Sequence, residues 1–319
     1  MGRRAVLALA LLTGCAGGVA PTAPAPPSVP LVRAANPPVV AGCHMFPANN
    51  PWNTDISHDP VDPKSATYIA HMPGNLHADF GNTPGYGIPF NVVPANQKKV
   101  PISFAYSSES DPGPYPIPPN AYIEGWPHPS SDRHVLVLQQ GTCTLYEVDM
   151  AYEHDGGKRW TGISGAIFHL NSNKLRPNGW TSADAAGLPM TQALVKCAEV
   201  RAGAIDHALR FSVGQTQRGF IHPATHFASS SSDPDLPPMG LRVRLKASFD
   251  ISRFNRVSQI ILTAMKTYGM LLADNGGSWY FSGQGGPQES CWRNSELNQL
   301  KTVPSSAFEV VKTGPILHV

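Results

Sequence analysis

The organising stretch of the chain is GWTSADAAGLPMTQALVKCAEVRAGAIDHALR, residues 179–210. It begins with the strongest helix-start signal in the sequence, because Thr181 or Ser182 can cap a helix whose first turn holds Asp184. A carboxylate at that position suits the exposed backbone amides and the helix dipole. Gly187 soon ends or interrupts this helix. Capping alone accounts for Asp184, so a catalytic role for this acid is an alternative that needs partners elsewhere in the chain.

The remainder of this stretch predicts a second helix and then a strand. The helix covers residues 191–201, with Leu194 and Cys197 in its apolar stripe, and Gly203 stops it. Residues 207–213 have the pattern of a strand that enters a sheet. Because strand-like segments lie on both sides, we expect the whole stretch to join two β-rich halves.

The composition favours a β-rich fold. Charged residues make up only 14% of the chain, and 32 prolines and 29 glycines suit many turns and short strands better than a helical bundle. We expect a mainly β fold with a few helices, arranged as a jelly-roll-like β-sandwich in a single domain; an α+β fold is the alternative. Strand patterns occur at 88–93, 100–106, 135–138, 143–148, 163–170, 241–249 and 270–273, and a helix pattern occurs at 257–268.

The chain begins with a secretion signal, MGRRAVLALALLTGC (residues 1–15). Two arginines precede an apolar run that is too short to span a membrane. The run LTGC, residues 12–15, resembles the bacterial lipobox, which implies a signal peptide of residues 1–14 and lipidation of Cys15. The alternative is an ordinary signal peptide that is cut after a small residue such as Ala16.

The segment after the signal reads as a tether. Residues 15–41 are rich in proline and alanine and have almost no charge, which is typical of a semi-extended linker, so the globular domain is expected at residues 42–319. We expect a secreted, monomeric lipoprotein at the outer membrane or cell surface, held to the membrane only by its lipid. Loss of two arginines with the signal leaves 22 of the 24 basic residues against 22 acidic ones, so no nucleic-acid partner is expected.

The cysteines predict two disulfides. With Cys15 used as the lipid anchor, four cysteines remain, and an even number in an oxidising compartment suggests disulfide pairs. Three pairings are open, of which we favour Cys43–Cys143 and Cys197–Cys291. The spacings match no thiolate metal motif, so no metal site is expected at the cysteines.

Several acids are candidates for chemistry. Glu109 and Asp111 precede a proline-rich run, and on an extended chain their side chains would point to the same side, as an acid pair or a calcium site. The alternative is an Asx-turn at Asp111 and a solvated Glu109. Asp274 follows a buried strand beside a glycine turn and aromatic residues, although aspartate is also a good turn former there.

These residues suggest a carbohydrate-active enzyme, most simply a glycoside hydrolase, because paired carboxylates are the minimal machinery for that reaction. The catalytic candidates are Glu109, Asp111, Asp184, His207 and Asp274. The candidates for substrate contact are Asp79, Trp180, His226 and Trp279. No cofactor is expected apart from calcium. The alternative is a non-catalytic module that binds a glycan or a peptide; a serine hydrolase is disfavoured because the sequence has no GxSxG motif.

Long runs of the sequence resemble a family of secreted bacterial proteins without an assigned activity. The runs are ESDPGPYPIP (109–118), LRPNGWTSADAAGLP (175–189), IDHALR (205–210), PPMGLRVRLKASFDIS (237–252) and YGMLLADNG (268–276). The resemblance covers nearly all of residues 43–311 and implies secretion and a shared domain. It transfers no reaction.

Overall fold

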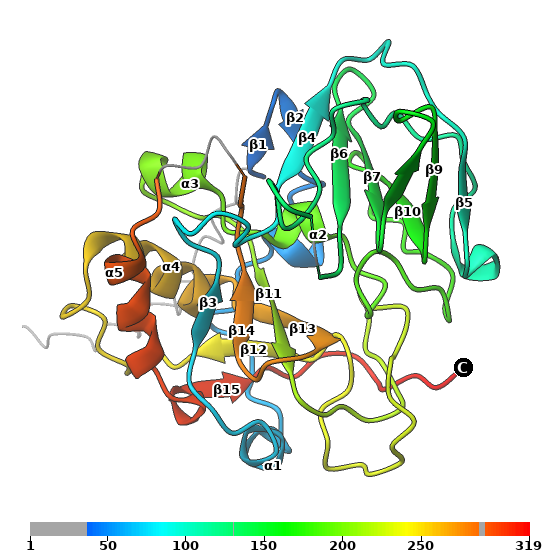
Figure 1. The fold of residues 1–319 in the computed structure, drawn as a ribbon. Coiled ribbons are helices and arrows are strands. Elements are labelled where there is room, and N and C mark those ends of the chain that lie inside the picture. The colour runs from blue at the N-terminus through cyan, green and yellow to red at the C-terminus, as the bar shows by residue number, and fades with distance from the viewer. Residues whose placement is uncertain (1–36, 130, 287–290) are drawn as a thin grey trace, which may run out of the picture. The chain divides into compact units, whose positions relative to one another are not determined.

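The computed structural model describes residues 37–129, 131–286 and 291–319, which belong to a unit that begins at Ala34 (Figure 1). The predicted signal peptide and Cys15 lie outside the described residues. The fold starts inside the segment expected to be a tether, because β1 (Val39–Val40) pairs antiparallel with β2 (Cys43–His44). The predicted class, mainly β with a few helices, is confirmed.

The larger sheet has six strands in the order β15-β12-β13-β11-β14-β3. Its strands are β3 (His77–Asp79), β11 (Leu209–Val213), β12 (Arg242–Leu245), β13 (Met270–Asn275), β14 (Tyr280–Ser282) and β15 (Phe308–Val310). The pairs β11–β13 and β14–β3 are parallel, and the others are antiparallel. The sheet is therefore mixed, unlike the antiparallel sheets of the expected jelly roll.

A four-stranded sheet, in the order β10-β7-β6-β4, lies beside a three-stranded sheet, β5-β9-β8 (Figure 1). Their strands are β4 (Phe90–Val93), β5 (Ile102–Phe104), β6 (Val135–Gln139), β7 (Thr144–Val148), β8 (Tyr152–His154), β9 (Arg159–Gly162) and β10 (Gly165–His169). Val135 and Val137 pack into a core with residues of the three-stranded sheet, whereas Leu136 joins a cluster with Met190 and Leu194. The strand β6 is thus buried on both faces, which explains its continuous apolar sequence.

The helices are short except for one. They are α1 (Ser65–Ala70), α2 (Met190–Ala193), α3 (Cys197–Ala202), α4 (Arg256–Thr267) and α5 (Asn294–Leu297), with 3₁₀ turns at Pro51–Asn53, Ser107–Glu109, Asn298–Thr302 and Ser305–Ala307. The predicted helix at 257–268 is confirmed as α4. Asn255 caps it by accepting the Ser258 N–H at 3.0 Å, and Gly269 follows in the left-handed region with φ 69°. None of the helices described is long and apolar enough to cross a membrane.

The organising stretch differs from its prediction at its start. No helix forms after Thr181; residues 181–189 make a turn in which the Ser182 hydroxyl accepts the Asp184 N–H at 2.9 Å and donates to the Leu188 carbonyl at 2.7 Å. The serine therefore bonds its local backbone in place of a helical ladder. The second predicted helix is split into α2 and α3, and Gly203 ends α3 with φ 90° as expected.

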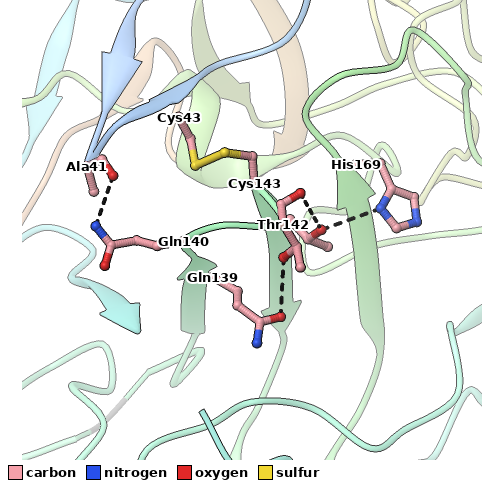
Figure 2. Close-up of a disulfide and its surroundings, with 8 residues drawn as sticks. Ala41, Cys43, Gln139, Gln140, Thr142, Cys143 and His169 are labelled. Carbon is pink, nitrogen blue, oxygen red and sulfur yellow. Dashed lines mark hydrogen bonds between the residues drawn. A yellow bond between two sulfur atoms is a disulfide. The ribbon is translucent and has the colours of Figure 1, made fainter. Parts of the chain in front are cut away.

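Both predicted disulfides are confirmed. Cys43–Cys143 joins β2 to the turn between β6 and β7, with a Cα–Cα distance of 5.4 Å, and Cys197–Cys291 fixes the start of α3, with a Cα–Cα distance of 5.9 Å. Figure 2 shows the first bridge, beside which the Gln140 side chain donates to the Ala41 carbonyl at 3.0 Å. Two disulfides place the protein in an extracellular or otherwise oxidising environment.

Candidate functional site

A cavity of about 850 Å³ is the main candidate site. Its volume lies in the range of sites that enclose small ligands. Several loops and strand ends form it. They include the 3₁₀ turn at Ser107–Glu109, the segment before β6, the turns that follow β7 and precede β10, the 181–185 turn, the 226–230 loop and the end of β13. The charged and histidine side chains in its wall are Glu109, Asp132, His134, Asp149, Asp184, Arg218, His226 and Asp274.

The wall of the cavity on the side of the six-stranded sheet is built around Arg210. This side chain on β11 donates to both carboxylate oxygens of Asp184, at 2.8 and 2.9 Å, and to the Ser282 hydroxyl at 2.6 Å. Asp184 is 1% exposed and Arg210 is 7% exposed. The carboxylate of Asp184 is therefore one half of a buried bidentate ion pair and not a helix cap.

Asp274 lies next to this ion pair at the end of β13. Its Oδ2 is 3.7 Å from Nη2 of Arg210, because β11 and β13 are parallel neighbours. The side chain is 36% exposed and lines the cavity. Burial and then the nearby Asp184 carboxylate raise the pKa of Asp274 to about 6, against the opposing effect of Arg210.

A second pair of charges lies on the other side of the cavity. Nδ1 of His134 is 2.6 Å from Oε2 of Glu124, and Nε2 donates to the Ala183 carbonyl at 2.9 Å. Burial alone would lower the pKa of His134, but the Glu124 carboxylate outweighs it and raises the pKa to about 9. Asp149 follows β7, with Oδ1 3.7 Å from Nε2 of His134. Burial raises the pKa of Asp149 to about 6 although His134 acts in the opposite direction.

The predicted pair Glu109 and Asp111 separates in the structure. Glu109 lines the cavity, with Oε2 3.8 Å from Nε2 of His226. Asp111 bonds to Arg176 and accepts the Ile167 N–H at 2.9 Å, and it lines a different cavity of about 460 Å³. Glu109 is the last residue of the 3₁₀ turn, and the regular alternation of an extended strand does not include it, although Ser110 itself is extended with φ -116° and ψ 144°. They do not form the calcium site that the sequence suggested.

The remaining predicted residues lie outside the main cavity, except for His226. His207 is fully buried under α3, with Nε2 3.1 Å from Oε1 of Glu199. Trp279 is buried in the core and donates its indole N–H to the Met72 carbonyl at 2.6 Å.

Asp79 and Trp180 also lie apart from the cavity. Asp79 is on β3, opposite Ser282, and burial raises its pKa while a hydrogen bond with Tyr86 opposes this. Trp180 lines the 460 Å³ cavity with its ring 5.5 Å from the Arg176 guanidinium. Of the nine residues predicted for catalysis or substrate contact, four reach the main cavity: Glu109, Asp184, His226 and Asp274.

Sequence reasoning missed Asp149, His134 and Arg218. Asp149 directly follows the buried strand β7, which is the same signal that selected Asp274, and His134 directly precedes β6. Arg218 lies in a loop, with its guanidinium 5.8 Å from the ring of Phe227, and no local pattern marks it.

One group of side chains near the cavity has the spacing of a metal site. Ligand atoms of Glu124, Asp132 and His134 all lie within 4.8 Å of one another. However, Nδ1 of His134 faces the Glu124 carboxylate and Nε2 faces a carbonyl oxygen, so both ring nitrogens are used as hydrogen-bond donors. An imidazole that carries two protons has no lone pair for a metal. The three side chains therefore suit a protonated His134 better than a bound metal ion.

No protein-family model, curated protein or solved structure matches the chain. The function therefore has to be inferred from the cavity itself.

Proposed function

We propose that the protein is a glycoside hydrolase whose main cavity cleaves a glycan by general acid–base catalysis. One observation carries the proposal: two carboxyl groups, Asp149 and Asp274, line the same cavity, and the pKa of each is raised to about 6. Carboxyl groups with raised pKa values are suited to hold and transfer protons near neutral pH. Glycosidic bond hydrolysis needs two carboxyl groups that flank the bond, one as a protonated acid and one as a carboxylate.

The neighbours of the two acids suggest different roles. The Asp184 carboxylate favours the protonated form of Asp274, which suits a proton donor, whereas the His134 imidazolium favours the ionised form of Asp149, which suits a base. In the proposed step Asp274 gives its proton to the glycosidic oxygen as the carbon–oxygen bond breaks. A water molecule attacks the sugar carbon and gives its proton to Asp149.

The remaining lining suits a polar ligand with flat apolar faces. Tyr106 is 57% exposed beside the cavity, and the rings of His226 and Phe227 stack with centroids 5.7 Å apart. Aromatic faces bind sugar rings, and the hydroxyls of Ser229 and Ser230 can bond to sugar hydroxyls. The same features would serve a non-catalytic glycan-binding module, so turnover has to be measured directly.

The test is a screen of polysaccharides with detection of new reducing ends. We expect Asp274→Asn and Asp149→Asn each to lower the rate by about 10²–10⁴-fold, because each removes a proton-transfer group. Asp155→Asn, a change on the exposed β8–β9 turn, is the matched control and should keep full activity. Activity should peak near pH 6, since it falls below that pH as the base is protonated and above it as the acid ionises. Glycan that is retained without any product over long incubation would show a binding module instead.

We also propose that the protein is a lipoprotein attached through Cys15, in line with the lipobox-like run before it. The oxidising environment indicated by the disulfides fits a protein outside the cytoplasm. Mass spectrometry of the N-terminal peptide from the native host should find an acylated Cys15. An unmodified N-terminus at a later residue would mean an ordinary signal peptide.

A further inference from the structure

We propose that Glu124 and His134 are positioning residues that keep a permanent positive charge under the main cavity and thereby hold the Asp149 carboxylate ready as the base. This inference rests on the proposed function for its catalytic meaning. The protonation states of His134 and Asp149 can be measured without any substrate.

The contact between Glu124 and His134 fixes the imidazole ring. Besides the 2.6 Å bond between the two side chains, the backbone N–H of Glu124 donates to the His134 carbonyl at 3.0 Å. The same carboxylate oxygen accepts the backbone N–H of His134 at 3.4 Å. The two backbone contacts hold the Glu124 carboxylate in place, and the hydrogen bonds at both ring nitrogens leave the ring little rotational freedom.

The surroundings of the ring also fix its charge. Nε2 faces the Ala183 carbonyl, which can only accept a hydrogen bond, so this nitrogen carries a proton. Nδ1 faces a carboxylate, which is also an acceptor when ionised, so it carries the second proton. A ring with both protons is an imidazolium, and the raised pKa of His134 agrees with this geometry.

The imidazolium connects the two sides of the cavity. Its Nε2 lies 3.7 Å from the Asp149 carboxylate, and it holds the carbonyl of Ala183, the residue before Asp184. The charged groups near His134 come from several elements. Glu124 and Asp132 lie in the segment before β6, Asp149 follows β7, Arg210 is on β11 and Asp274 is on β13. Among them Glu124 makes the only direct hydrogen bond to the ring in the described part of the chain, which makes it the residue to change.

The test is a titration by NMR of the full protein, in wild type and in Glu124→Gln. In the wild type we expect His134 to titrate near pH 9, and Asp149 near pH 6. Glu124→Gln removes the carboxylate, so the pKa of His134 should fall well below 9, because only the weaker attraction of Asp149 then opposes burial and Arg210. Asp149 should then titrate roughly one unit higher, since it loses a cation within 4 Å.

Asp132→Asn is the matched control, because Asp132 raises the pKa of Asp149 through its own charge. This variant should lower the pKa of Asp149, the opposite direction to Glu124→Gln. A merely structural role for Glu124 would move neither titration, and a wild-type His134 that titrates near pH 6.5 would overturn the inference even if the Gln variant did not fold.

Titration of the two side chains and turnover of glycan test the charge arrangement and the proposed function separately. If no glycan is hydrolysed but His134 and Asp149 titrate as expected, the proposed function is wrong and the charge arrangement stands. If glycan is hydrolysed, Glu124→Gln should shift the acidic limb of the pH profile of kcat/KM upward by roughly one unit. Turnover with an unshifted limb would overturn the inference alone.

Discussion

Arg210 carries a buried positive charge next to the cavity. It is almost fully buried, and its charge is balanced by Asp184 through two hydrogen bonds. A buried ion pair adds little stability by itself, but removing one partner leaves an uncompensated charge in the interior. Asp184 therefore has a structural role as the counter-charge of Arg210, whatever its part in chemistry.

We expect Asp184→Asn to lower the free energy of unfolding by roughly 3–5 kcal/mol, because it leaves Arg210 without a full counter-charge. Urea denaturation at neutral pH measures the effect. Asp274→Asn should cause a much smaller change, since Arg210 keeps its two bonds to Asp184 in that variant. Equal stability of Asp184→Asn and the wild type would show that the ion pair does not hold this part of the fold.

Single residues were predicted with mixed success, for a physical reason. Asp274 reaches the cavity because an acid after a buried strand stays at the sheet end wherever the strand goes. Glu109 and Asp111 do not stay together, because Glu109 ends a 3₁₀ turn that lines the main cavity, whereas Asp111 pairs with the distant Arg176. The partner of Trp279 is the carbonyl of Met72 in a distant segment, and a single sequence holds no record of that contact.

At the scale of elements, strands were easier to predict than the short helices. Residues 135–139 and 144–148 form strands as expected, because continuous apolar runs bounded by turn residues leave few alternatives. The helix expected after Thr181 fails because its possible cap bonds within a local turn, and α2 begins only at Met190. The start of α2 is instead capped by a residue from another element.

That residue is Glu147, which is fully buried on β7. Its carboxylate accepts the backbone N–H groups of Met190 and Thr191, each at 2.8 Å, and the Thr191 hydroxyl at 2.6 Å. The strand pattern around this acid is compatible with an outward strand residue or a cleft acid. It is neither, because it links the four-stranded sheet to the first turn of α2.

We expect Glu147→Gln to lower the free energy of unfolding by about 1–3 kcal/mol. The amide group of glutamine would place a donor against backbone donors and lose at least one hydrogen bond in a buried site. Glu153→Gln, on the exposed strand β8, is the matched control and should change little. Thermal unfolding measures the stability of both variants. A Glu147→Gln variant as stable as the wild type would show that this cap is dispensable.

At the scale of the whole described unit, the two disulfides each close a long segment of chain. The sequence separations are 100 and 94 residues, so each bridge restricts the unfolded chain strongly. The pairing was predicted from the sequence, but the mixed sheets were not, because parallel pairing of β11 with β13 brings together segments about 60 residues apart.

We expect the double variant Cys43→Ser, Cys143→Ser to lose roughly 4–5 kcal/mol of unfolding free energy, as the loop-closure model gives for a loop of this length. The corresponding change at Cys197 and Cys291 should have a similar size, since its loop is nearly as long. Guanidinium denaturation of the oxidised wild type and the two variants measures this. A loss below about 1 kcal/mol for either would mean that folded-state contacts already hold the joined segments together.

The two covalent loops have a further consequence when a protease cuts the chain. One loop runs from Cys43 to Cys143 and the other from Cys197 to Cys291, so together they enclose well over half of the described chain. A single cut inside either loop leaves both pieces joined through sulfur. Such a nicked molecule would keep its cavity walls together and would show two fragments only after reduction.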